Sequence, residues 1–392
     1  MSGINSSSAG NQHEIQVSLP VLKVIGLGGG GQNAVDRMIE LGLSGIEFIA
    51  ANSDAQVLQK SQAPVKIQLG PKCTRGLGAG GDPVIGEEAA EESHSELEKA
   101  LAGADMVFLT CGMGGGTGTG AIPVAASIAK SLGSVVVAIV STPFSFEIGR
   151  RQANARNGLG KLQQYTDTLI TVPNDRLLQI APRDLSLEMA FRLADDILRQ
   201  GIQGISEIIT QPGLINVDFS HIKRLMKNGG GSLLAIGTGQ GENRVNDALE
   251  HALHHPMLET INLENATGII ANFTGGEDLA FSEVVEALDD LHNRTGGRAD
   301  IIPGVISDPR MEDRVQLILV LTGLGGTTLE QARRDVSGTT QEPVEQKAQQ
   351  KKTDFPFLMV DQASPEGEEK TDTDTDLDIP AFMRKKNELR GD

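Results

Sequence analysis

Apolar and polar stretches alternate along the first half of the chain in the rhythm of strands and helices. Short apolar runs that indicate buried strands are separated by stretches such as 33–41 and 87–101, in which apolar residues recur at helical spacing. This alternation predicts a parallel sheet with helices on both faces, and right-handed crossovers then gather the strand-to-helix loops at one edge, where ligands bind. The strands expected in this half are 21–27, 46–52, 106–110, 135–141 and 168–172.

A long helix is expected to follow over residues 185–210. Leu187, Phe191 and Leu198 belong to its apolar spacing, and Pro212 would end it. Because this helix is longer than an ordinary surface helix, it could connect two domains. The chain beyond it predicts a smaller group of α/β elements without a comparable glycine-rich loop: strands 233–237, 268–274, 300–307 and 315–322, and helices 220–227, 244–254 and 280–294.

The composition of the two chain ends differs from that of the middle. Residues 1–19 are polar and predict a disordered N-terminal extension, and residues 328–376 are rich in Gln, Glu, Lys, Asp, Thr and Ser and predict a disordered acidic linker. Apolar residues return beside a basic cluster in 377–392, which is typical of a docking peptide, although chance composition would give the same pattern.

Overall composition narrows the class of protein. Of the 392 residues 39% are apolar and 3% aromatic, so aliphatic side chains are expected to fill a sizeable core. The net charge of −18 argues against general binding to nucleic acid or to anionic membranes. No apolar run predicts a membrane span, and residues 1–14 lack the apolar stretch of a signal peptide. Cys73 and Cys111 are too few for a disulfide framework, so a cytoplasmic location and small buried cysteines are expected.

The segment 112–120 is the strongest candidate for binding chemistry. It is rich in glycine and threonine, follows the expected strand 106–110 and precedes an expected helix over 122–132. Its bare backbone can surround an anion with N–H groups, and the helix directs its positive end to the same point. A flexible glycine turn is the alternative.

Two further glycine segments extend this interpretation. The segment 26–31 fits G-x-G-x-x-G, which alone would suggest a dinucleotide site, and Asn52-Ser53-Asp54 after the next strand does not discriminate. With 76–81 as a third, the segments suit a chain of two or three phosphates. The P-loop consensus G-x-x-x-x-G-K-[ST] is absent.

These segments, together with Asn216-Val217-Asp218-Phe219 after the long helix, resemble the tubulin/FtsZ family, and within it the FtsZ branch of cell-division GTPases. The resemblance covers about residues 20–325, and Asp378-Ile379-Pro380-Ala381-Phe382 is similar to the tail motif of that branch. It implies a Rossmann-like GTP-binding domain with a parallel sheet over 20–184, a central helix over 185–211 and a smaller α/β activation domain over 212–327. GTP or GDP would be bound, accompanied by Mg²⁺ held largely by phosphate oxygens and water.

The resemblance also assigns roles to residues at matching positions. One group would line the phosphates and the base side: Gly29, Gly30, Gly31, Gln32 and Asn33. A second group would cradle the phosphates: Gly116, Thr117 and Gly118. Glu147 and Arg151 would reach the ribose.

Asp195, on the long helix, would pair with guanine. A carboxylate can accept both N1–H and the exocyclic amine of guanine, whereas adenine offers no such donor pair. Asp195 and Asp196 are adjacent, so only one of them can face the base. Without the family, a solvated helix carboxylate would be the favoured interpretation of Asp195.

The catalytic loop departs from the family pattern. The resemblance implies a site split between subunits, in which the loop after the next subunit's long helix carries two acids three residues apart that orient the attacking water. Here the first acid is present as Asp218, and His221 replaces the second. Because general-base groups commonly contribute about 10²–10⁴-fold, hydrolysis is expected to be slower and more dependent on pH. The alternative is that Asp218 acts alone and His221 only caps or packs.

His251, His254 and His255 form a further cluster at the end of an expected helix. His251 and His255 share a face at i, i+4, as zinc ligands can, but no acidic or cysteine partners follow at ligand spacing. A solvent-facing cluster is therefore favoured, and no protein-held metal is expected.

The function expected from these features is a GTPase that polymerises head to tail into filaments of the division ring. Its partners would be further copies of itself and a membrane adaptor or other division proteins, bound through the segment from Asp378 to Arg384. A GTP-bound structural scaffold with little turnover is the second interpretation, supported by His221. A Rossmann oxidoreductase that binds NAD is more distant, since it leaves 114–120 and the tail unexplained.

Overall fold

The computed structural model describes residues 19–147, 149–180, 185–211, 217–227, 230–255, 258 and 262–324. The chain divides into two compact units, Met1–Pro343 and Val344–Asp392, and every described residue belongs to the first. The expected N-terminal extension, acidic linker and docking peptide lie outside the described residues, apart from Leu19. The domain boundaries given above stay predictions.

The described strands form one ten-stranded sheet in the order β3-β2-β1-β4-β5-β6-β7-β10-β8-β9. Its first six members are all parallel to one another, and their order, 3-2-1-4-5-6, is that of doubly wound nucleotide-binding folds. These strands are β1 (Leu22–Leu27), β2 (Glu47–Asn52), β3 (Val65–Gln68), β4 (Met106–Gly112), β5 (Val135–Thr142) and β6 (Thr168–Pro173).

The second half of the sheet is mixed. β7 (Gly230–Gln240) pairs in parallel with β6 over only three residues, whereas β10 (Arg314–Thr322) runs antiparallel to β7 and to β8 (Gly268–Gly275). β9 (Asp300–Ser307) is parallel to β8 at the edge. The α/β class with a mostly parallel sheet is confirmed, while the parallel character ends where β7 meets β10.

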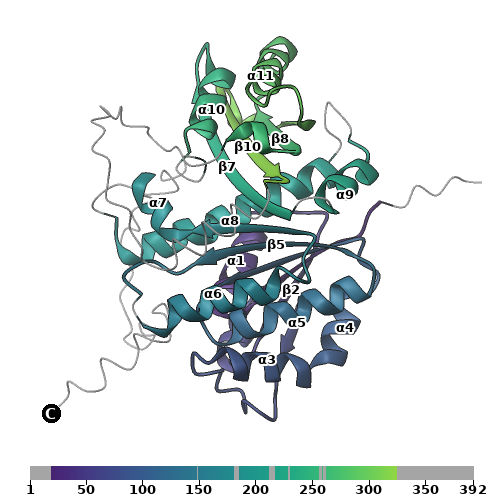
Figure 1. Ribbon diagram of the computed structural model, residues 1–392, viewed down its shortest axis with the longest axis vertical. Helices are drawn as coiled ribbons and strands as arrows, with labels where there is room; N and C mark the ends of the chain where they lie inside the picture. Colours follow the sequence, from purple (N-terminus) through teal and green to yellow (C-terminus); the bar gives the residue numbers. More distant parts are fainter. Residues whose placement is uncertain are drawn as a thin grey trace, which may run out of the picture. The chain divides into compact units, whose positions relative to one another are not determined.

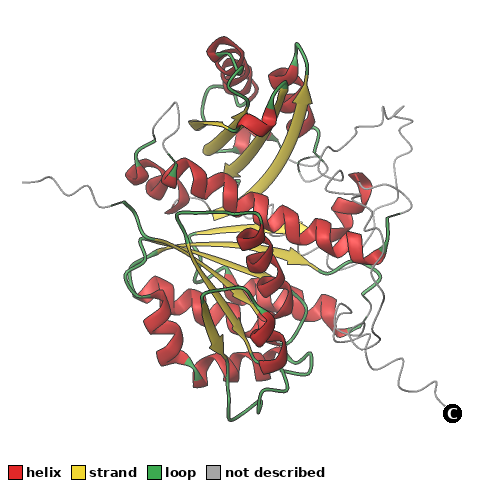
Figure 2. Ribbon diagram, turned by 180° about the vertical axis from the view of Figure 1, so that it is seen from behind, coloured by secondary structure: helices red, strands yellow, loops and turns green. Residues whose placement is uncertain are grey.

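Helices cover both faces of the parallel half (Figure 1). One face carries α1 (Gly28–Glu40) and the long helix α8 (Leu187–Thr210), and the other carries α3 (Pro83–Glu92), α4 (His94–Leu101), α5 (Thr117–Ser131) and α6 (Arg150–Leu162). α8 also contacts β8, β9 and β10, so it packs against both halves of the sheet (Figure 2). The smaller half adds α9 (Phe219–Lys227), α10 (Arg244–Leu253) and α11 (Phe281–Arg294).

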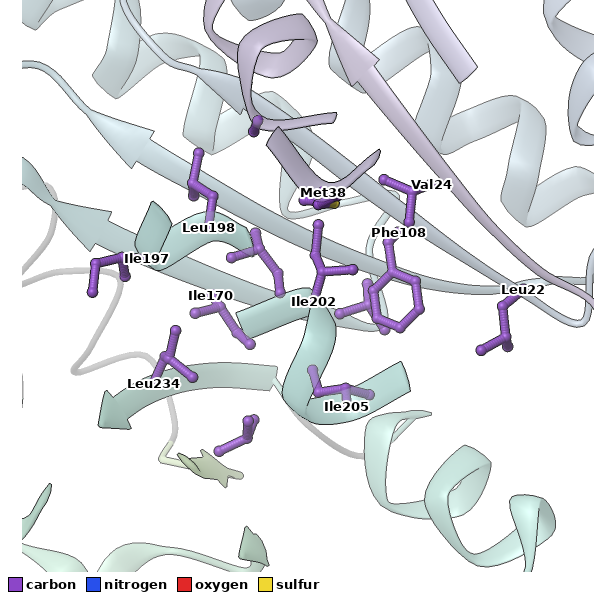
Figure 3. Packing of buried hydrophobic residues seen from close by; sticks show 14 of the residues in the cluster. Leu22, Val24, Met38, Phe108, Ile170, Ile197, Leu198, Ile202, Ile205 and Leu234 are labelled. Atoms are coloured by element: carbon purple, nitrogen blue, oxygen red, sulfur yellow. The ribbon is translucent and has the colours of Figure 1, made fainter. Parts of the chain in front are cut away.

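Alternation along the strands explains the two layers. Val24 and Phe108 face α8, while their chain neighbours Ile25 and Leu109 face the opposite layer. Ile202 of α8 points toward Met38, Val24 and Phe108 in the first layer (Figure 3). Both layers are dominated by aliphatic side chains, as the scarcity of aromatic residues predicts.

Several local predictions were wrong. The single helix expected over 87–101 is two helices, because the buried Ser93 uses its hydroxyl to accept from Gly70 N and to donate to Gln68 O, and the chain turns there. Three helices and a strand were not assigned from the spacing of apolar residues. They are α2 (Ala55–Lys60), α6, α7 (Asn174–Ile180) and β3. Cys111 is buried as expected, but Cys73 is exposed.

Candidate functional site

Two of the glycine segments lie side by side at the carboxyl ends of β1 and β4. These neighbouring strands lead to helices on opposite faces of the sheet, which makes this the switch point where doubly wound folds bind ligands. A Cβ at Gly28 would lie 2.8 Å from Gly118 N, and one at Gly30 would lie 3.2 Å from Gly112 N. The backbones therefore approach so closely that only glycine fits at Gly28 without a shift.

Gly28–Gly31 form the first turn of α1, whereas in the second segment Gly114–Gly116 form a turn before α5, and Gly118 and Gly120 lie in the first turn of that helix. α1 begins at Gly28 and α5 at Thr117, several residues earlier than expected. The first N–H groups of a helix have no partner within it and carry its positive dipole end. Two such turns meeting at one point supply convergent donors that fit a phosphate chain.

We call the two facing glycine segments, 26–31 and 112–120, the cradle. Its open side is marked by Gly29 and Gly115. A Cβ at either position would meet nothing within 4 Å, whereas one at Gly31 would lie 2.3 Å from Thr110 O. Gly31 is therefore required for packing, and the glycines that border open space are the positions where a ligand can approach the backbone.

Hydroxyl and amide groups hold the cradle in place. Thr117 Oγ1 lies 2.6 Å from Ser53 Oγ, and Thr119 Oγ1 accepts from Gly114 N at 2.8 Å. The buried Gln32 donates to Val57 O at 2.9 Å, so its amide nitrogen is engaged inside the protein, and Asn33 is exposed. Contacts expected from Gln32 would have to come from its main chain.

The third glycine segment packs against the second. A Cβ at Gly116 would lie 2.9 Å from Ala79 Cβ, and Asn154 Nδ2 donates to both Gly81 O (3.1 Å) and Gly114 O (3.3 Å). The structure thus brings all three segments together. Asn154 is a site-supporting residue that no motif marks, and Ser53 was noted only within Asn52-Ser53-Asp54, without a role at the glycine segments.

Glu147 and Arg151 pair with each other. Arg151 Nε lies 2.7 Å from Glu147 Oε2, and Glu147 Oε1 accepts from Phe144 N at 2.9 Å. The main chain of Arg151 borders the cradle, since a Cβ at Gly114 would lie 2.9 Å from Arg151 O. The pair therefore stands beside the glycine segments, with the Glu147 carboxylate buried and engaged.

Asp195 and Asp196 have separate environments. Asp196 is buried, accepts from Arg199 Nε at 2.7 Å and also contacts Gln200. Burial, and secondarily the charge of Asp196, raises the pKa of Asp195 to about 8. Phe191, one turn before Asp195 on α8, packs edge-on against Phe144, so Asp195 shares the helix face that meets the Glu147 loop.

Asp218 and His221 lie on the side of the sheet where the parallel strands begin, which we call its amino edge; the cradle lies at the carboxyl edge, where these strands end. α9 is anchored by Thr168 Oγ1, which donates to Met226 O at 2.6 Å, and Thr168 is the first residue of β6. The cradle, in contrast, lies at the carboxyl ends of the strands parallel to β6. Along α8 the distance from Asp195 to Thr210 alone is about 22 Å at 1.5 Å per residue. One chain therefore does not bring these two expected parts of the site together.

The environment of Asp218 keeps it ionised. Its Oδ1 accepts from Ser220 N at 2.8 Å, and this bond, helped by the nearby His221, holds the pKa of Asp218 below its ordinary value. His221 Nε2 lies 2.8 Å from Asp300 Oδ2, a contact that bridges 79 residues of sequence. Asp300 was missed because no local pattern links it to the loop.

The histidine cluster is only partly as expected. His251 and His254 are exposed, but His255 is buried and its burial lowers the pKa to about 4, so the prediction of a solvent-facing cluster was wrong for His255. Among the described residues no group of His, Cys, Asp and Glu side chains could hold a metal ion, and no helix is long and apolar enough to cross a membrane.

Comparison with known proteins assigns the fold and the family. A family model described as the GTPase domain of the tubulin/FtsZ family matches residues 21–182, and one described as the FtsZ family C-terminal domain matches residues 230–325. A solved FtsZ dimer from M. jannaschii is 43% identical with a TM-score of 0.76, over 79% of this chain and 90% of that one. The chain belongs to the tubulin/FtsZ family. It is therefore an FtsZ-family GTPase, and the family match implies GTP or GDP as its nucleotide.

Two further solved structures share the fold. A mutant FtsZ from M. jannaschii is 44% identical with a TM-score of 0.75, over 78% of this chain and 91% of that one. CetZ1 from Haloferax volcanii, solved as a GDP-bound monomer, is 22% identical with a TM-score of 0.68, over 81% of this chain and 98% of that one. At that identity the likeness concerns the architecture alone.

Proposed function

We propose that this FtsZ-family GTPase polymerises head to tail, and that each GTP is hydrolysed where the cradle of one subunit meets the loop before α9 of the next. The observation that carries the proposal is the placement of the cradle and Asp218 at opposite edges of the sheet. A head-to-tail contact between two different surfaces extends into a filament when its rotation does not close a ring, and under the proposed function it extends in this way. Hydrolysis then depends on assembly, because an isolated subunit holds only half a site.

Within this proposal the residues divide into binding and hydrolytic groups. The first turns of α1 and α5 hold the phosphates, Arg151 and Glu147 reach the ribose side, and Asp195 accepts from guanine. Asp218 and His221 of the next subunit orient the attacking water. Mg²⁺ accompanies the nucleotide, held by phosphate oxygens and water, since metal-holding side-chain groups are absent from the described part of the chain.

The cellular role that we propose is the division ring at the future septum. The chain would act in the cytoplasm at mid-cell, with the segment from Asp378 to Arg384 binding a membrane adaptor or another division protein. Its net charge of −18 disfavours nucleic acid as a partner. Titrating a synthetic peptide of this segment against candidate adaptors tests this part separately from the GTPase.

A GTP-bound scaffold with little turnover is the second candidate. It is favoured by the contact between His221 and Asp300, which engages one nitrogen of the residue that stands where the family has an acid. Turnover measured against protein concentration separates the two: an assembling GTPase shows a threshold with activity above it, and a scaffold assembles without comparable phosphate release.

Complementation between two inactive variants tests the split site. Gly29→Asp places a carboxylate in the open side of the cradle and blocks nucleotide binding, while Asp218→Asn removes the acid of the loop. Neither variant alone should release phosphate from GTP. In an equal mixture, about one contact in four joins an intact cradle to an intact loop if subunits add at random in a head-to-tail filament.

The expected result is recovery of activity in the mixture, measured as phosphate release and sedimentable polymer. The double variant Gly29→Asp/Asp218→Asn mixed with wild type serves as the control for mixing itself, since it contributes neither half of a site. Recovery to no more than the sum of the two single variants means that the whole site lies within one chain, and the proposed function is then wrong.

A further inference from the structure

The loop's histidine is held by a carboxylate from another element. His221, in the first turn of α9, contacts Asp300, the first residue of β9, with Nε2 and Oδ2 2.8 Å apart. Their side chains are 34% and 50% exposed, so the pair lies at the surface rather than in the core. An exposed pair at this edge is available to a neighbouring molecule.

Two further charged groups in the described part of the chain, Asp218 and Arg224, interact with this pair. Asp218 precedes His221 in the loop, and attraction to His221 helps to lower the pKa of Asp218. Arg224, one turn further along α9, lies 3.5 Å from Asp300 Oδ2. The hydrogen bond from His221, before all other causes, holds the pKa of Asp300 below its ordinary value. The carboxylate of Asp300 is therefore ionised at neutral pH.

An ionised carboxylate on Nε2 decides which tautomer the neutral ring adopts. Because the carboxylate can only accept, Nε2 carries the proton and the lone pair resides on Nδ1. The carboxylate also opposes rotation of the ring and stabilises the imidazolium that forms when Nδ1 takes up a proton. This is the relation between a general base and the group that orients it.

We propose that Asp300 is a positioning residue for GTP hydrolysis on the adjoining subunit, holding His221 so that Nδ1 accepts a proton from the attacking water. This inference rests on the proposed function. As the water oxygen bonds to the γ-phosphorus, the bond from that phosphorus to the β–γ bridging oxygen breaks and GDP leaves. The water's proton passes to Nδ1 and from there to the phosphate product or solvent, while the Asp218 carboxylate orients the water.

The dyad explains how the loop tolerates the loss of its second acid. A carboxylate is still present next to position 221, but it belongs to β9 and acts through the imidazole. The base then has one nitrogen available instead of two carboxylate oxygens, which agrees with the slower and more pH-dependent turnover expected from the sequence.

A double-mutant cycle in the full chain tests the coupling. His221→Gln is expected to lower GTP turnover per polymerised subunit on the order of 10²–10⁴-fold, as loss of a general base does. Asp300→Asn is expected to lower it on the order of 10–100-fold, as loss of an orienting partner does. The double variant should lose no more than His221→Gln alone, because Asp300 acts only through the ring. Asp300→Glu should restore part of the activity. Sedimentation and GTP affinity, measured in parallel, should stay as in wild type.

A second test uses the direction in which Asp300→Asn changes GTP turnover. His221→Asp places a second carboxylate beside Asp300, so in that background Asp300→Asn should raise turnover instead of lowering it, since it removes a like-charge contact. Asp290→Asn, an exposed carboxylate paired with Arg294 on α11, is the matched control and should leave turnover unchanged.

If GTP turnover of Asp300→Asn is within twofold of wild type, Asp300 does not position His221. The same conclusion follows if the double variant loses turnover by a factor equal to the product of the two single-variant factors. The mixing experiment keeps this outcome distinct from failure of the proposed function. If Gly29→Asp and Asp218→Asn complement each other while Asp300→Asn remains active, the split site stands and only the role of Asp300 is wrong.

Discussion

The carboxyl and amino edges of the sheet differ in whether main-chain or side-chain groups form the proposed site. At the carboxyl edge the site consists mostly of main chain, and glycines such as Gly28 and Gly31 are fixed there by approaches that no side chain allows. At the amino edge the site consists of exposed side chains, Asp218, His221 and Asp300. A backbone site is tied to the fold and cannot vary without disturbing it. A side-chain site can change residue type while the fold stays intact, and under the proposed function His221 in place of the second acid is such a change.

Asp218→Asn gives the largest expected effect at the amino edge. Turnover should fall about 10²–10⁴-fold, because the group that orients the water loses its charge. Stability should change by less than about 0.5 kcal/mol, since asparagine at the start of α9 can still accept from Ser220 N as aspartate does. Phosphate release and urea unfolding of the same preparation separate the two quantities.

Asp308→Asn is the matched control, because Asp308 also accepts from a backbone N–H at the start of a short helix, that of Arg310. It should retain turnover. A loss of stability in Asp218→Asn as large as its loss of activity would show that the amino edge is as firmly tied to the fold as the cradle, and the contrast between the edges would disappear.

Gly26→Ala and Gly29→Ala test the carboxyl edge. A Cβ at Gly26 would lie 2.2 Å from Gly31 O and 2.8 Å from Val35 Cγ2, so this variant should lose about 3 kcal/mol of unfolding free energy through overpacking. Gly29→Ala has open space and should be neutral or slightly stabilised, because alanine favours a helix. It should nevertheless bind GTP more weakly, since its methyl group enters the side from which a ligand approaches.

Urea unfolding and GTP titration of both variants give the result. Equal destabilisation by the two substitutions would contradict the division of the cradle into packing glycines and ligand-facing glycines. Unchanged GTP affinity in Gly29→Ala would place the nucleotide elsewhere.

The sequence predicts the two edges unequally well. The cradle was found from glycine spacing, because close approach of backbones requires glycine and leaves a visible trace at Gly28 and Gly118. Five of the six strands of the parallel half were found because burial on both faces makes them almost continuously apolar, whereas β3, exposed at three of its four residues, was missed. α6 was missed because four of its thirteen residues are buried and two of those four are small. The buried residues are Ala155, Gly158, Leu159 and Leu162, and the rest of the stretch is mostly polar.

The amino edge could be predicted only in part. Asp218 and His221 were identified by likeness to a family motif, and the contact of His221 with Asp300 depends on how β9 is placed beside β8, which no local pattern encodes. The break at Ser93 was hidden for the same reason: its hydroxyl bonds to Gln68, the last residue of β3, and to Gly70 just after it, both more than twenty positions away. Local periodicity describes elements, whereas these features arise where elements meet.

Asp195 blurs the comparison, since it would add a side chain to the backbone cradle. Burial raises its pKa from 3.8 to about 8, so at neutral pH the unliganded protein holds it mostly protonated. Pairing with the N1–H and amine of guanine requires the carboxylate. GTP binding should therefore release a proton below pH 8, and the dissociation constant should decrease as pH rises, by up to about tenfold per unit between pH 6 and 8.

The nucleotide's own phosphate titration is common to wild type and Asp195→Asn, so the difference between their profiles reports on Asp195, and Glu188→Gln on the exposed side of α8 should follow wild type. A second readout needs no nucleotide. Because the native state keeps the Asp195 proton up to about pH 8 while the unfolded chain loses it near pH 3.8, stability of the unliganded protein should fall as pH rises through that window, and Asp195→Asn should remove this fall. Parallel profiles of wild type and Asp195→Asn in both assays would exclude Asp195 from the base side, and the cradle would then be a site of backbone alone.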